Sequence, residues 1–197
     1  MAGLSASSWI TASDHPMTPP VLYPAQRKSR LLACLLGLLC WVAPLRADNL
    51  AEYRLKAAFL VNFISFTEWP AGMGNKLNLC VYGPDPFGED LDKLEGKSVA
   101  GRRLAVRRMN SADALENCQI VFITRPVFGN LARVLDTLNG KPVLTMADTP
   151  GAIHQGVVLN MITEQNKIQF EANLGAAHNN GLVLSSKLLR LAKEVVQ

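Results

Sequence analysis

The chain has 197 residues, enough for one domain with a hydrophobic core and too few for two domains of ordinary size. Its composition, 49% hydrophobic and 18% charged, is typical of a folded globular protein and excludes a disordered chain. The formal net charge is +4, but most of this excess lies in residues 1–47. The rest of the chain has 16 basic and 15 acidic residues, a net charge of +1, so nucleic-acid binding is not indicated.

The N-terminal segment has the pattern of a secretory signal. A basic cluster at residues 27–30 precedes an apolar run at residues 31–45, and the small residue Ala47 lies at the expected cleavage point. The run is too short and too interrupted by proline for a comfortable transmembrane helix. We therefore expect residues 1–47 to be removed as a leader after Ala47. Residues 48–197 are then exported, to a bacterial periplasm, as one domain.

Without the leader the chain keeps two cysteines, Cys80 and Cys118. In an oxidising compartment such a pair is open to disulfide formation. The alternative is two small buried thiols, because free cysteine is among the most buried residue types. The chain has no CxxC motif, so thiol redox chemistry is not indicated.

The apolar pattern up to residue 147 predicts strands and helices in alternation. In chain order we expect a helix at 50–66, a strand at 75–83, a short helix at 89–94, a strand at 103–109, a short helix from 111, a strand at 118–124, a helix at 128–138 and a strand at 142–147. Such alternation implies right-handed crossovers and a parallel sheet covered by helices on both faces.

The alternation ends in the last third of the chain. Two apolar segments, 156–162 and 167–173, flank the polar turn 163–166 and predict an antiparallel hairpin. A final helix is expected over 182–195, because four apolar residues fall on one stripe: Leu184, Leu188, Leu191 and Val195. The predicted fold is an α/β three-layer sandwich with a mostly parallel sheet flanked by helices and a C-terminal antiparallel hairpin.

The first predicted helix is unusual because residues 57–66 are apolar nearly all round, apart from Asn62 and Ser65. One interpretation buries this helix against the sheet, with Asn62 satisfying backbone groups and Trp69 capping the core. The other interpretation places part of this helix, or of the final helix, against a partner chain, since excess apolar surface marks interfaces.

Polar residues near both ends of the domain leave a similar choice. Glu171 and Asn173 either cap the turn into the last helix or line a shared polar site with Asn62 and Glu68. Because burying an unpaired carboxylate costs several kcal/mol, each glutamate is expected to have a donor or to be exposed. For Glu68 the candidate donors are Arg54 and Lys56.

The usual signatures of cofactor and metal sites are missing. The segment YGPDPFGED after the first strand has neither GxGxxG nor GxxxxGK[ST], and its prolines remove amide donors. His154 and His178 have no third metal ligand at suitable spacing. We therefore predict no cofactor and no metal. The acidic residues of the following short helix fit a solvated face better than a calcium loop: Asp85, Glu89, Asp90 and Asp92.

Catalytic groups are not recognised either. The triplet Ser185-Ser186-Lys187 lies in a predicted amphipathic helix without a glycine-rich loop beside it, and it is interpreted as a polar helix face. We therefore predict that the protein is not an enzyme. Four arginines flank the strand at 103–109, and protection of a sheet edge is favoured over anion or lipid-headgroup binding: Arg102, Arg103, Arg107 and Arg108.

Successive motifs of the chain resemble a known family. From about Glu52 to Leu191, the motifs KAAFLVNFISFTEWP, LNLCVYGPDPFG, LEGKSVAGRRLAVRRM, CQIVFIT, GKPVLTMAD and KIQFEANLGAAHNNGLVLSSKLLRLA follow one another as in the YfiR-like periplasmic proteins. The resemblance implies a small α/β protein, often a dimer, with a cysteine pair at Cys80 and Cys118. It also implies a second disulfide near the hairpin, for which MADTPGAIHQGVVLN has no cysteine.

The function that the resemblance implies is regulatory. Studied members bind the periplasmic portion of an inner-membrane diguanylate cyclase and repress cyclic-di-GMP synthesis, and an OmpA-like outer-membrane lipoprotein sequesters them. The first hypothesis is therefore a non-enzymatic periplasmic regulator of a membrane signalling protein, a cyclase or a sensor. The alternative is a periplasmic small-ligand binding protein that uses the crevice at the C-terminal ends of the strands. A hydrolase with an unrecognised site is a third, weaker hypothesis.

Overall fold

The computed structural model of the chain describes residues 44–197, with side chains from Asn49 onward. The predicted leader falls mostly on residues 1–43, outside this range, and its removal after Ala47 stays a prediction. No helix within 44–197 combines the length and the apolar character needed to cross a bilayer. The helices and strands are α2 (Pro44–Ser65), β1 (Thr67–Glu68), β2 (Lys76–Tyr82), α3 (Glu89–Asp92), β3 (Ser98–Val99), β4 (Arg102–Met109), η1 (Asp113–Asn117), β5 (Ile120–Ile123), η2 (Arg125–Asn130), α4 (Leu131–Leu138), β6 (Leu144–Ala147), η3 (Ile153–Gln155), β7 (Leu159–Glu164), β8 (Lys167–Asn173), α5 (Leu174–Asn179), β9 (Val183–Leu184), α6 (Ser186–Leu189) and β10 (Glu194–Val196).

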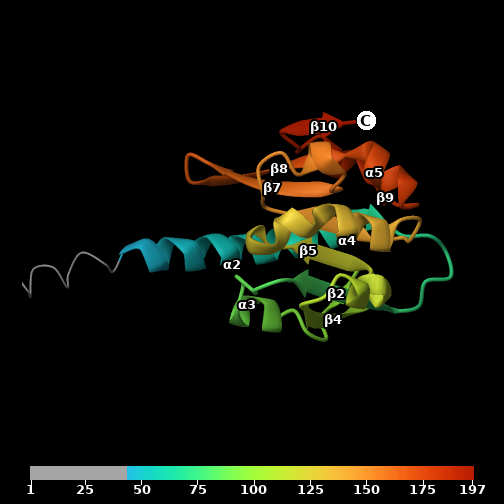
Figure 1. Cartoon of the computed structure of the whole chain (residues 1–197), viewed down its shortest axis with the longest axis horizontal. Helices are drawn as coiled ribbons and strands as arrows, with labels where there is room; N and C mark the ends of the chain where they lie inside the picture. Colours follow the sequence, from blue (N-terminus) through green and yellow to red (C-terminus); the bar gives the residue numbers. More distant parts are fainter. Residues whose placement is uncertain (1–43) are drawn as a thin grey trace, which may run out of the picture. The chain divides into compact units, whose positions relative to one another are not determined.

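An eight-stranded sheet runs through the domain in the order β10-β8-β7-β6-β5-β2-β4-β3 (Figure 1). The strands β4, β2, β5, β6 and β7 are parallel, β7 and β8 form the predicted antiparallel hairpin, and β10 returns parallel to β8. The predicted mostly parallel sheet with a C-terminal hairpin is confirmed. From β2 the chain crosses to β4 on one side and then returns to β5 on the other side.

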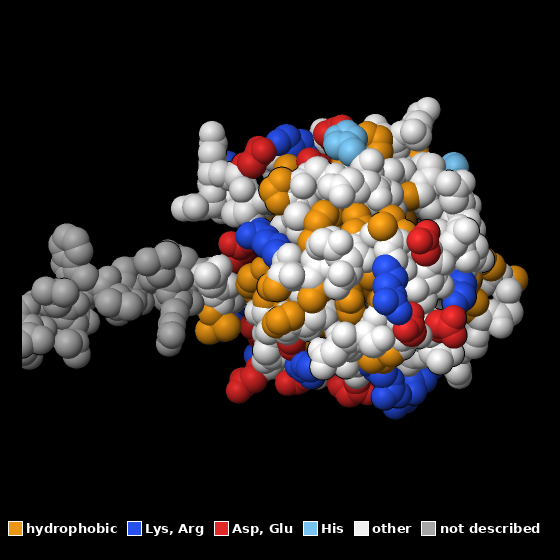
Figure 2. Space-filling model, viewed as in Figure 1, with side chains coloured by type: hydrophobic (Ala, Val, Ile, Leu, Met, Phe, Trp, Pro, Cys, Tyr) orange, Lys and Arg blue, Asp and Glu red, His pale blue; other side chains and the backbone are white. Residues whose placement is uncertain are grey.

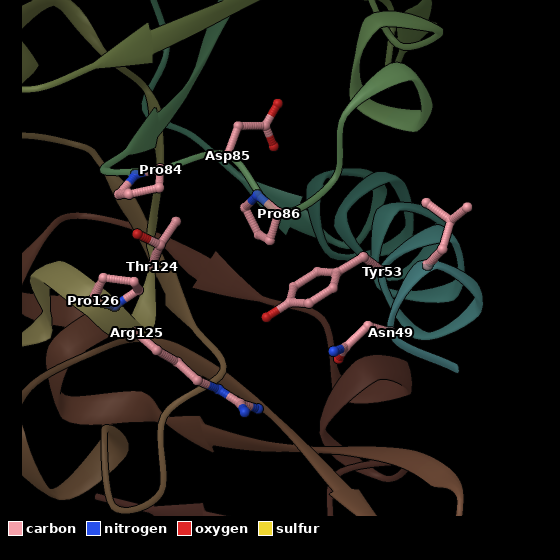
Figure 3. A pocket seen from close by; sticks show the side chains of 9 residues that line it. Asn49, Tyr53, Pro84, Asp85, Pro86, Thr124, Arg125 and Pro126 are labelled. Atoms are coloured by element: carbon pink, nitrogen blue, oxygen red, sulfur yellow. The ribbon is translucent and has the colours of Figure 1, made fainter. Parts of the chain in front are cut away.

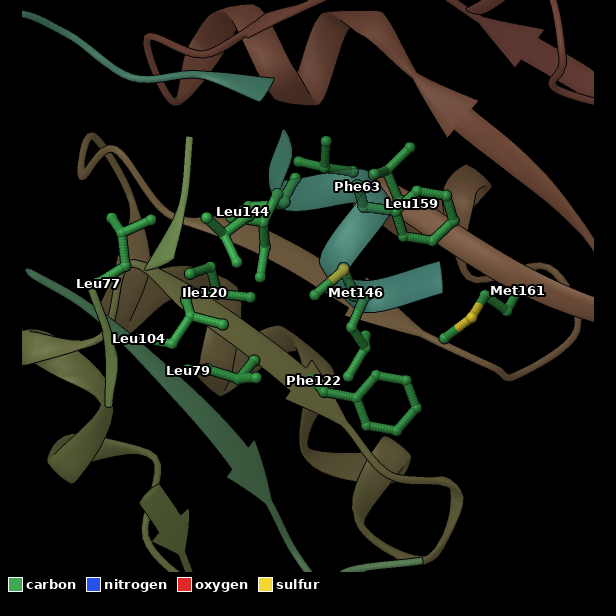
Figure 4. Close-up of a cluster of buried hydrophobic side chains, with 14 of the residues drawn as sticks. Phe63, Leu77, Leu79, Leu104, Ile120, Phe122, Leu144, Met146, Leu159 and Met161 are labelled. Atoms are coloured by element: carbon green, nitrogen blue, oxygen red, sulfur yellow. The ribbon is translucent and has the colours of Figure 1, made fainter. Parts of the chain in front are cut away.

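The central strands are buried on both faces, as their continuous apolar sequences predict. Because side chains alternate across a strand, Leu77 and Leu79 of β2 pack in one cluster with α2, whereas Cys80 packs in a second cluster with α4. In β5, Ile120 and Phe122 face the α2 side, which Figure 4 shows together with Phe63 of α2. The two helices therefore cover opposite faces of the sheet and form the outer layers of a three-layer sandwich.

Most of the apolar side chains of α2 pack in the core, as the first of the two interpretations of this helix predicted. Leu60, Phe63 and Ile64 are buried against the sheet, and Phe63 meets Phe170 of β8 with the ring centroids 5.0 Å apart. The helix begins at Pro44, six residues before the predicted start. Its other side is open: Leu55 remains 49% exposed.

The predicted final helix over 182–195 is wrong. Val183 and Leu184 form β9, which pairs antiparallel with Thr67 and Glu68 of β1, and α6 is a single turn. The last residues form β10 on the edge of the main sheet. Backbone pairing with distant strands therefore overrides the helical spacing of the four apolar residues. The helix α5, which follows the hairpin directly, was not predicted.

A disulfide joins Cys80 of β2 to Cys118 just before β5, with the Cα atoms 6.0 Å apart. The bridged alternative therefore holds, and the pair agrees with the resemblance. Both cysteines are buried in the cluster that packs against α4. The bridge closes a loop that contains β3, β4 and the connections around them.

The arginine-rich strand β4 lies next to one edge of the sheet, because β3 pairs only with Arg102 and Arg103. Beyond this point the Glu95 carboxylate accepts a hydrogen bond from the Val106 amide at 2.6 Å. Arg108 is not free to bind an anion, since it pairs with two aspartates at 2.7 and 2.8 Å: Asp85 and Asp92. This arrangement fits the interpretation of these arginines as edge protection. On the face in Figure 2, basic side chains are scattered among acidic ones.

Candidate functional site

The C-terminal ends of β2, β5 and β6 meet beside the N-terminal half of α2. Because the connections leave β2 and β5 toward opposite sides of the sheet, a crevice is expected between the two loops that follow these strands. The loop after β2 begins at Gly83, and the loop after β5 begins at Thr124. This is the topological switch point of the parallel sheet, the usual place for a ligand site in open α/β sheets.

Gly83 allows these two loops to approach closely. Its φ of +97° is in the left-handed region, and a Cβ atom there would lie 2.4 Å from Thr124 Oγ1. The Thr124 hydroxyl donates to the carbonyl of Tyr82 at 3.0 Å, which ties the end of β5 to the end of β2. A side chain at residue 83 would therefore push the loops apart.

The switch-point pocket is the hollow of about 520 Å³ that lies between these loops and α2. Figure 3 shows the Tyr53 ring pointing from α2 toward Arg125, with proline rings on the other side of the hollow. The lining is mostly apolar, with a few polar groups: Asn49, Leu50, Tyr53, Pro84, Asp85, Pro86, Thr124, Arg125 and Pro126. Such a combination is typical of small-molecule sites.

A buried ionic cluster lies beneath this pocket. The Lys56 side chain is fully buried, and its Nζ lies 2.5 Å from Asp148 Oδ2 and 2.5 Å from Glu52 Oε1. Asp148 directly follows β6, whereas Lys56 and Glu52 stand one turn apart on α2. The cluster therefore fixes the helix to the C-terminal end of the sheet. Burying a lysine is tolerable here because two carboxylates compensate its charge.

Two further side chains complete the cluster around Asp148. The Tyr53 hydroxyl donates to Asp148 Oδ2 at 2.8 Å, and Arg125 donates through Nε to the Asp148 carbonyl at 2.9 Å. The guanidinium also lies 3.3 Å from Asp148 Oδ2. Burial, followed by the hydrogen bond to Asp148, raises the pKa of Tyr53. All these contacts use the backbone or Oδ2, and the buried Oδ1 of Asp148 has no hydrogen-bond partner.

A second hollow, here called the hairpin pocket, lies on the other side of Arg125 and has a volume of about 490 Å³. Besides Arg125 it is lined by four acidic residues, Glu52, Asp148, Glu164 and Glu171, and by Pro150, Gly151, Ile162 and Thr163. Burial raises the pKa of Glu52, but hydrogen bonds from Lys56 and Thr163 outweigh this effect, so that its pKa lies below the usual 4.5. Glu52 therefore stays ionised at neutral pH.

The predicted residues at the end of α2 do not form a buried polar site. Asn62 is exposed, so it does not satisfy backbone groups inside the core. Trp69 is buried, as expected for a cap on the core, with the Arg102 guanidinium 5.9 Å from its ring centroid. Glu68 is exposed on β1 and needs no donor. Arg54, one of the two donors suggested for it, pairs with Asp90 instead.

The predicted residues of the hairpin have separate roles. Glu171 is partly buried and accepts a hydrogen bond from Asn160 Nδ2 at 2.9 Å. Asn173 caps the N-terminus of α5 by accepting from the Ala176 amide at 2.7 Å, and its amide group donates to the Ile153 carbonyl. Asn173 is therefore a helix cap, but the helix is α5 and not the predicted final helix. Within residues 44–197 no hydrogen bond joins Glu171 or Asn173 to Asn62 or Glu68, so the structure does not bring these four residues together.

The remaining candidate groups have structural partners. Within residues 44–197 no group of three or more histidine, cysteine and acidic side chains is placed to hold a metal ion. Asp90 pairs with Lys93 at 2.7 Å, and the Ser185 hydroxyl caps α6 by accepting from the Leu188 amide at 3.2 Å. The triplet at 185–187 thus begins a helical turn and does not lie inside a long helix.

Sequence reasoning missed the residues that dominate the site: Lys56, Arg125 and Asp148. A usable signal exists for two of them, because Arg125 and Asp148 each follow a buried parallel strand by one or two residues. The carboxyl ends of neighbouring parallel strands meet at one edge of the sheet. Lys56 was considered only as a donor for Glu68, although a lysine directly before a long apolar run is a candidate for burial.

Of two solved structures that resemble the chain, the first supports the fold. The ABC domain from Streptococcus pneumoniae, solved in complex with L-Trp, matches with a TM-score of 0.51 and 10% identity over 71% of this chain and 60% of that chain. A conserved domain protein from Vibrio cholerae matches with a TM-score of 0.46 and 12% identity over 72% of this chain and 60% of that chain. The chain thus spans less than two thirds of either relative.

The family is shown by a separate comparison. The model of YfiR/HmsC-like proteins matches residues 53–193, which contain β1 to β9, most of α2 and most of the residues that line the two pockets. The match extends over nearly all of the domain that the structure describes. The chain therefore belongs to the YfiR/HmsC-like family.

Proposed function

We propose that this protein is a non-enzymatic periplasmic regulator that binds the periplasmic part of an inner-membrane diguanylate cyclase and represses cyclic-di-GMP synthesis. The observation that carries this proposal is the family match over residues 53–193. The signal-like pattern of residues 1–47 agrees with export. By the same analogy, the protein forms a homodimer, and an OmpA-like outer-membrane lipoprotein removes it from the cyclase.

Exposed apolar side chains offer two surfaces for a protein partner. Leu50 and Leu55 are exposed on α2, 54% and 49% respectively. Leu191 is 69% exposed between α6 and β10, in the same part of the chain as Val183 and Val195. Exposed leucines of this kind supply binding energy when a partner covers them. The α2 surface adjoins the switch-point pocket, which Leu50 lines.

The test is recovery of partners from membranes. The full chain, expressed with a C-terminal tag and purified in the form to which the cell processes it, is used to capture detergent-solubilised membrane proteins. We expect a diguanylate cyclase among the captured proteins and a rise of cellular cyclic-di-GMP when the gene is deleted. Leu55→Lys and Leu191→Lys test the two surfaces separately, and one of them should abolish capture. Capture of no signalling protein, with unchanged cyclic-di-GMP, would refute the proposal.

A second candidate function is binding of a small ligand, and the switch-point pocket is the observation that favours it. Tyr53, three prolines and Arg125 form an apolar hollow with one cationic end. L-Trp, the ligand in the pneumococcal structure, is a reasonable first probe. Saturable binding that is lost in Arg125→Ala would favour this function. Binding that also releases a captured cyclase would join the two functions in one mechanism.

A further inference from the structure

The charges of the hairpin pocket do not balance. Four carboxylates line it, and three cations pair with them: Lys56 with Glu52 and Asp148, Arg125 with Asp148, and Lys193 with Glu164. One negative charge is left over. It belongs to Glu171, whose only side-chain hydrogen-bond donor among residues 44–197 is the neutral amide of Asn160.

Asp148, which lines the pocket, also carries a buried acceptor that is not used. The Asp148 side chain is only 1% exposed, and its Oδ1 has no hydrogen-bond partner. The neighbouring donors do not supply one, because Lys56, Tyr53 and Arg125 all contact the other oxygen or the backbone. A buried carboxylate oxygen without a donor costs free energy, so a donor entering the pocket would be stabilising.

The donor that fits is an organic ammonium group. A metal ion would need several ligands that converge, and residues 44–197 contain no such group of side chains. A primary ammonium carries one positive charge and three N–H donors, which match one unbalanced charge and several free carboxylate oxygens. Pro150 and Ile162 line the same pocket and offer apolar surface to a hydrocarbon body.

We propose that the hairpin pocket binds a small molecule with a primary ammonium group, which donates hydrogen bonds to Asp148 Oδ1 and Glu171. This site is separate from the switch-point pocket and from the exposed leucines of the proposed function. Arg125 forms the wall between the two pockets, since it lines both. The hairpin β7–β8 forms one side of the site through Thr163, Glu164 and Glu171.

Benzylamine and benzyl alcohol are matched probes, because they differ in the ammonium group and share the hydrocarbon body. The full chain, expressed with a C-terminal tag and isotope-labelled, is titrated with each probe while amide resonances are followed by NMR. For a ligand of this size we expect benzylamine to bind with a Kd of about 1 mM at low salt. The shifted amides should include Gly151 and Thr163, and added salt should weaken binding. Benzyl alcohol should cause no saturable shift.

Two variants test the charge assignment. Glu171→Gln keeps an oxygen for Asn160 and removes the unbalanced charge, so benzylamine binding should weaken about fivefold or more. Glu164→Gln also removes one negative charge from the pocket, on the hairpin side, and should also weaken the binding of benzylamine. Glu68→Gln is the control, because it removes the same kind of side chain from β1, outside the pocket lining, and the affinity of this variant for benzylamine should not change. Equal binding of both probes, no saturable shift at about 20 mM, or unchanged affinity in Glu171→Gln would overturn the proposal.

Discussion

Replacing Lys56 by methionine tests whether the buried ionic cluster holds α2 to the sheet. The lysine is fully buried, with Asp148 and Glu52 each 2.5 Å from its Nζ. Its removal leaves Asp148, only 1% exposed, with Tyr53 and with the half-exposed Arg125 at 3.3 Å. Losing one partner of a buried pair costs about 3–5 kcal/mol. Because Arg125 still compensates part of the charge, we expect a loss of about 3 kcal/mol in the free energy of unfolding.

Urea unfolding followed by circular dichroism measures this loss. With a slope of about 2 kcal/mol per molar urea, a loss of this size lowers the midpoint by about 1.5 M while the slope is unchanged. Lys97→Met is the control, since Lys97 is exposed and has no ion pair with any residue in 44–197. The free energy of unfolding of this variant should stay within about 0.5 kcal/mol of the original.

The double variant Lys56→Met with Asp148→Leu separates charge from packing. It removes both partners, so its cost should be smaller than the sum of the two single costs by at least about 1 kcal/mol. A Lys56→Met protein within about 1 kcal/mol of the original, or additive costs in the double variant, would refute the argument that the cluster is a compensated buried charge.

Three further predictions follow from the disulfide and from the groups around Asp148. Replacing Cys80 and Cys118 together by alanine should lower the free energy of unfolding by about 4 kcal/mol, because the bridge spans 38 residues, and urea unfolding would measure this loss. Thiol titration of the unfolded, unreduced protein should find neither Cys80 nor Cys118 reactive. The pKa of Glu52 is lowered from 4.5, so its contribution is present above that pH and is lost as pH falls through the folded value; Glu52→Gln should flatten the acid limb of the stability profile, and an unchanged limb would contradict this. Tyr53 has its pKa raised from 10.0, so its contribution is present below that pH and is lost as pH rises through the folded value. An absorbance titration should find that one tyrosine ionises late and that Tyr53→Phe removes this step; ordinary titration of Tyr53 would refute it.

The parallel sheet could be predicted because the burial of its strands is visible in the sequence as continuous apolar runs. Residues 79–82 of β2 and residues 120–123, which form β5, are apolar without alternation, as expected when both faces are covered. The hairpin could be predicted from its polar turn, since β7 and β8 flank residues 165 and 166, which have positive φ. These signals are local, and local signals are what a single sequence contains.

The last segment could not be predicted, because its conformation depends on distant partners. Leu184 and Leu188 are buried, but Leu191 is largely exposed, so the apparent stripe is not one helix face. Val183 is the strand-pairing partner of Glu68 on β1, and Val195 is the strand-pairing partner of Ala172 on β8. Strands of two or three residues, such as β9 and β10, leave no periodic pattern that competes with a helical spacing.

The site was predicted only in its position. The crevice at the C-terminal ends of the strands was expected for a ligand-binding protein, and both pockets lie there. The individual residues were not predicted, because the contact of Lys56 with Asp148 joins positions 92 residues apart. Nothing in the local sequence of either residue specifies such a pair, whereas the cap at Asn173 is a local contact and was expected.

The carboxylate of Glu95, which accepts the Val106 amide, has a consequence for how neighbouring molecules meet. Within the part of the chain that the structure describes, the outer side of β4 has no partner strand over residues 105–109, so its backbone groups there are open to a strand from another molecule. Glu95 already occupies one of the amides that such an intruder would need. Removing the Glu95 carboxylate should therefore increase the light scattering of concentrated samples while the melting temperature stays nearly unchanged. We thus expect the solubility of the protein to depend on a side chain that takes no part in its core.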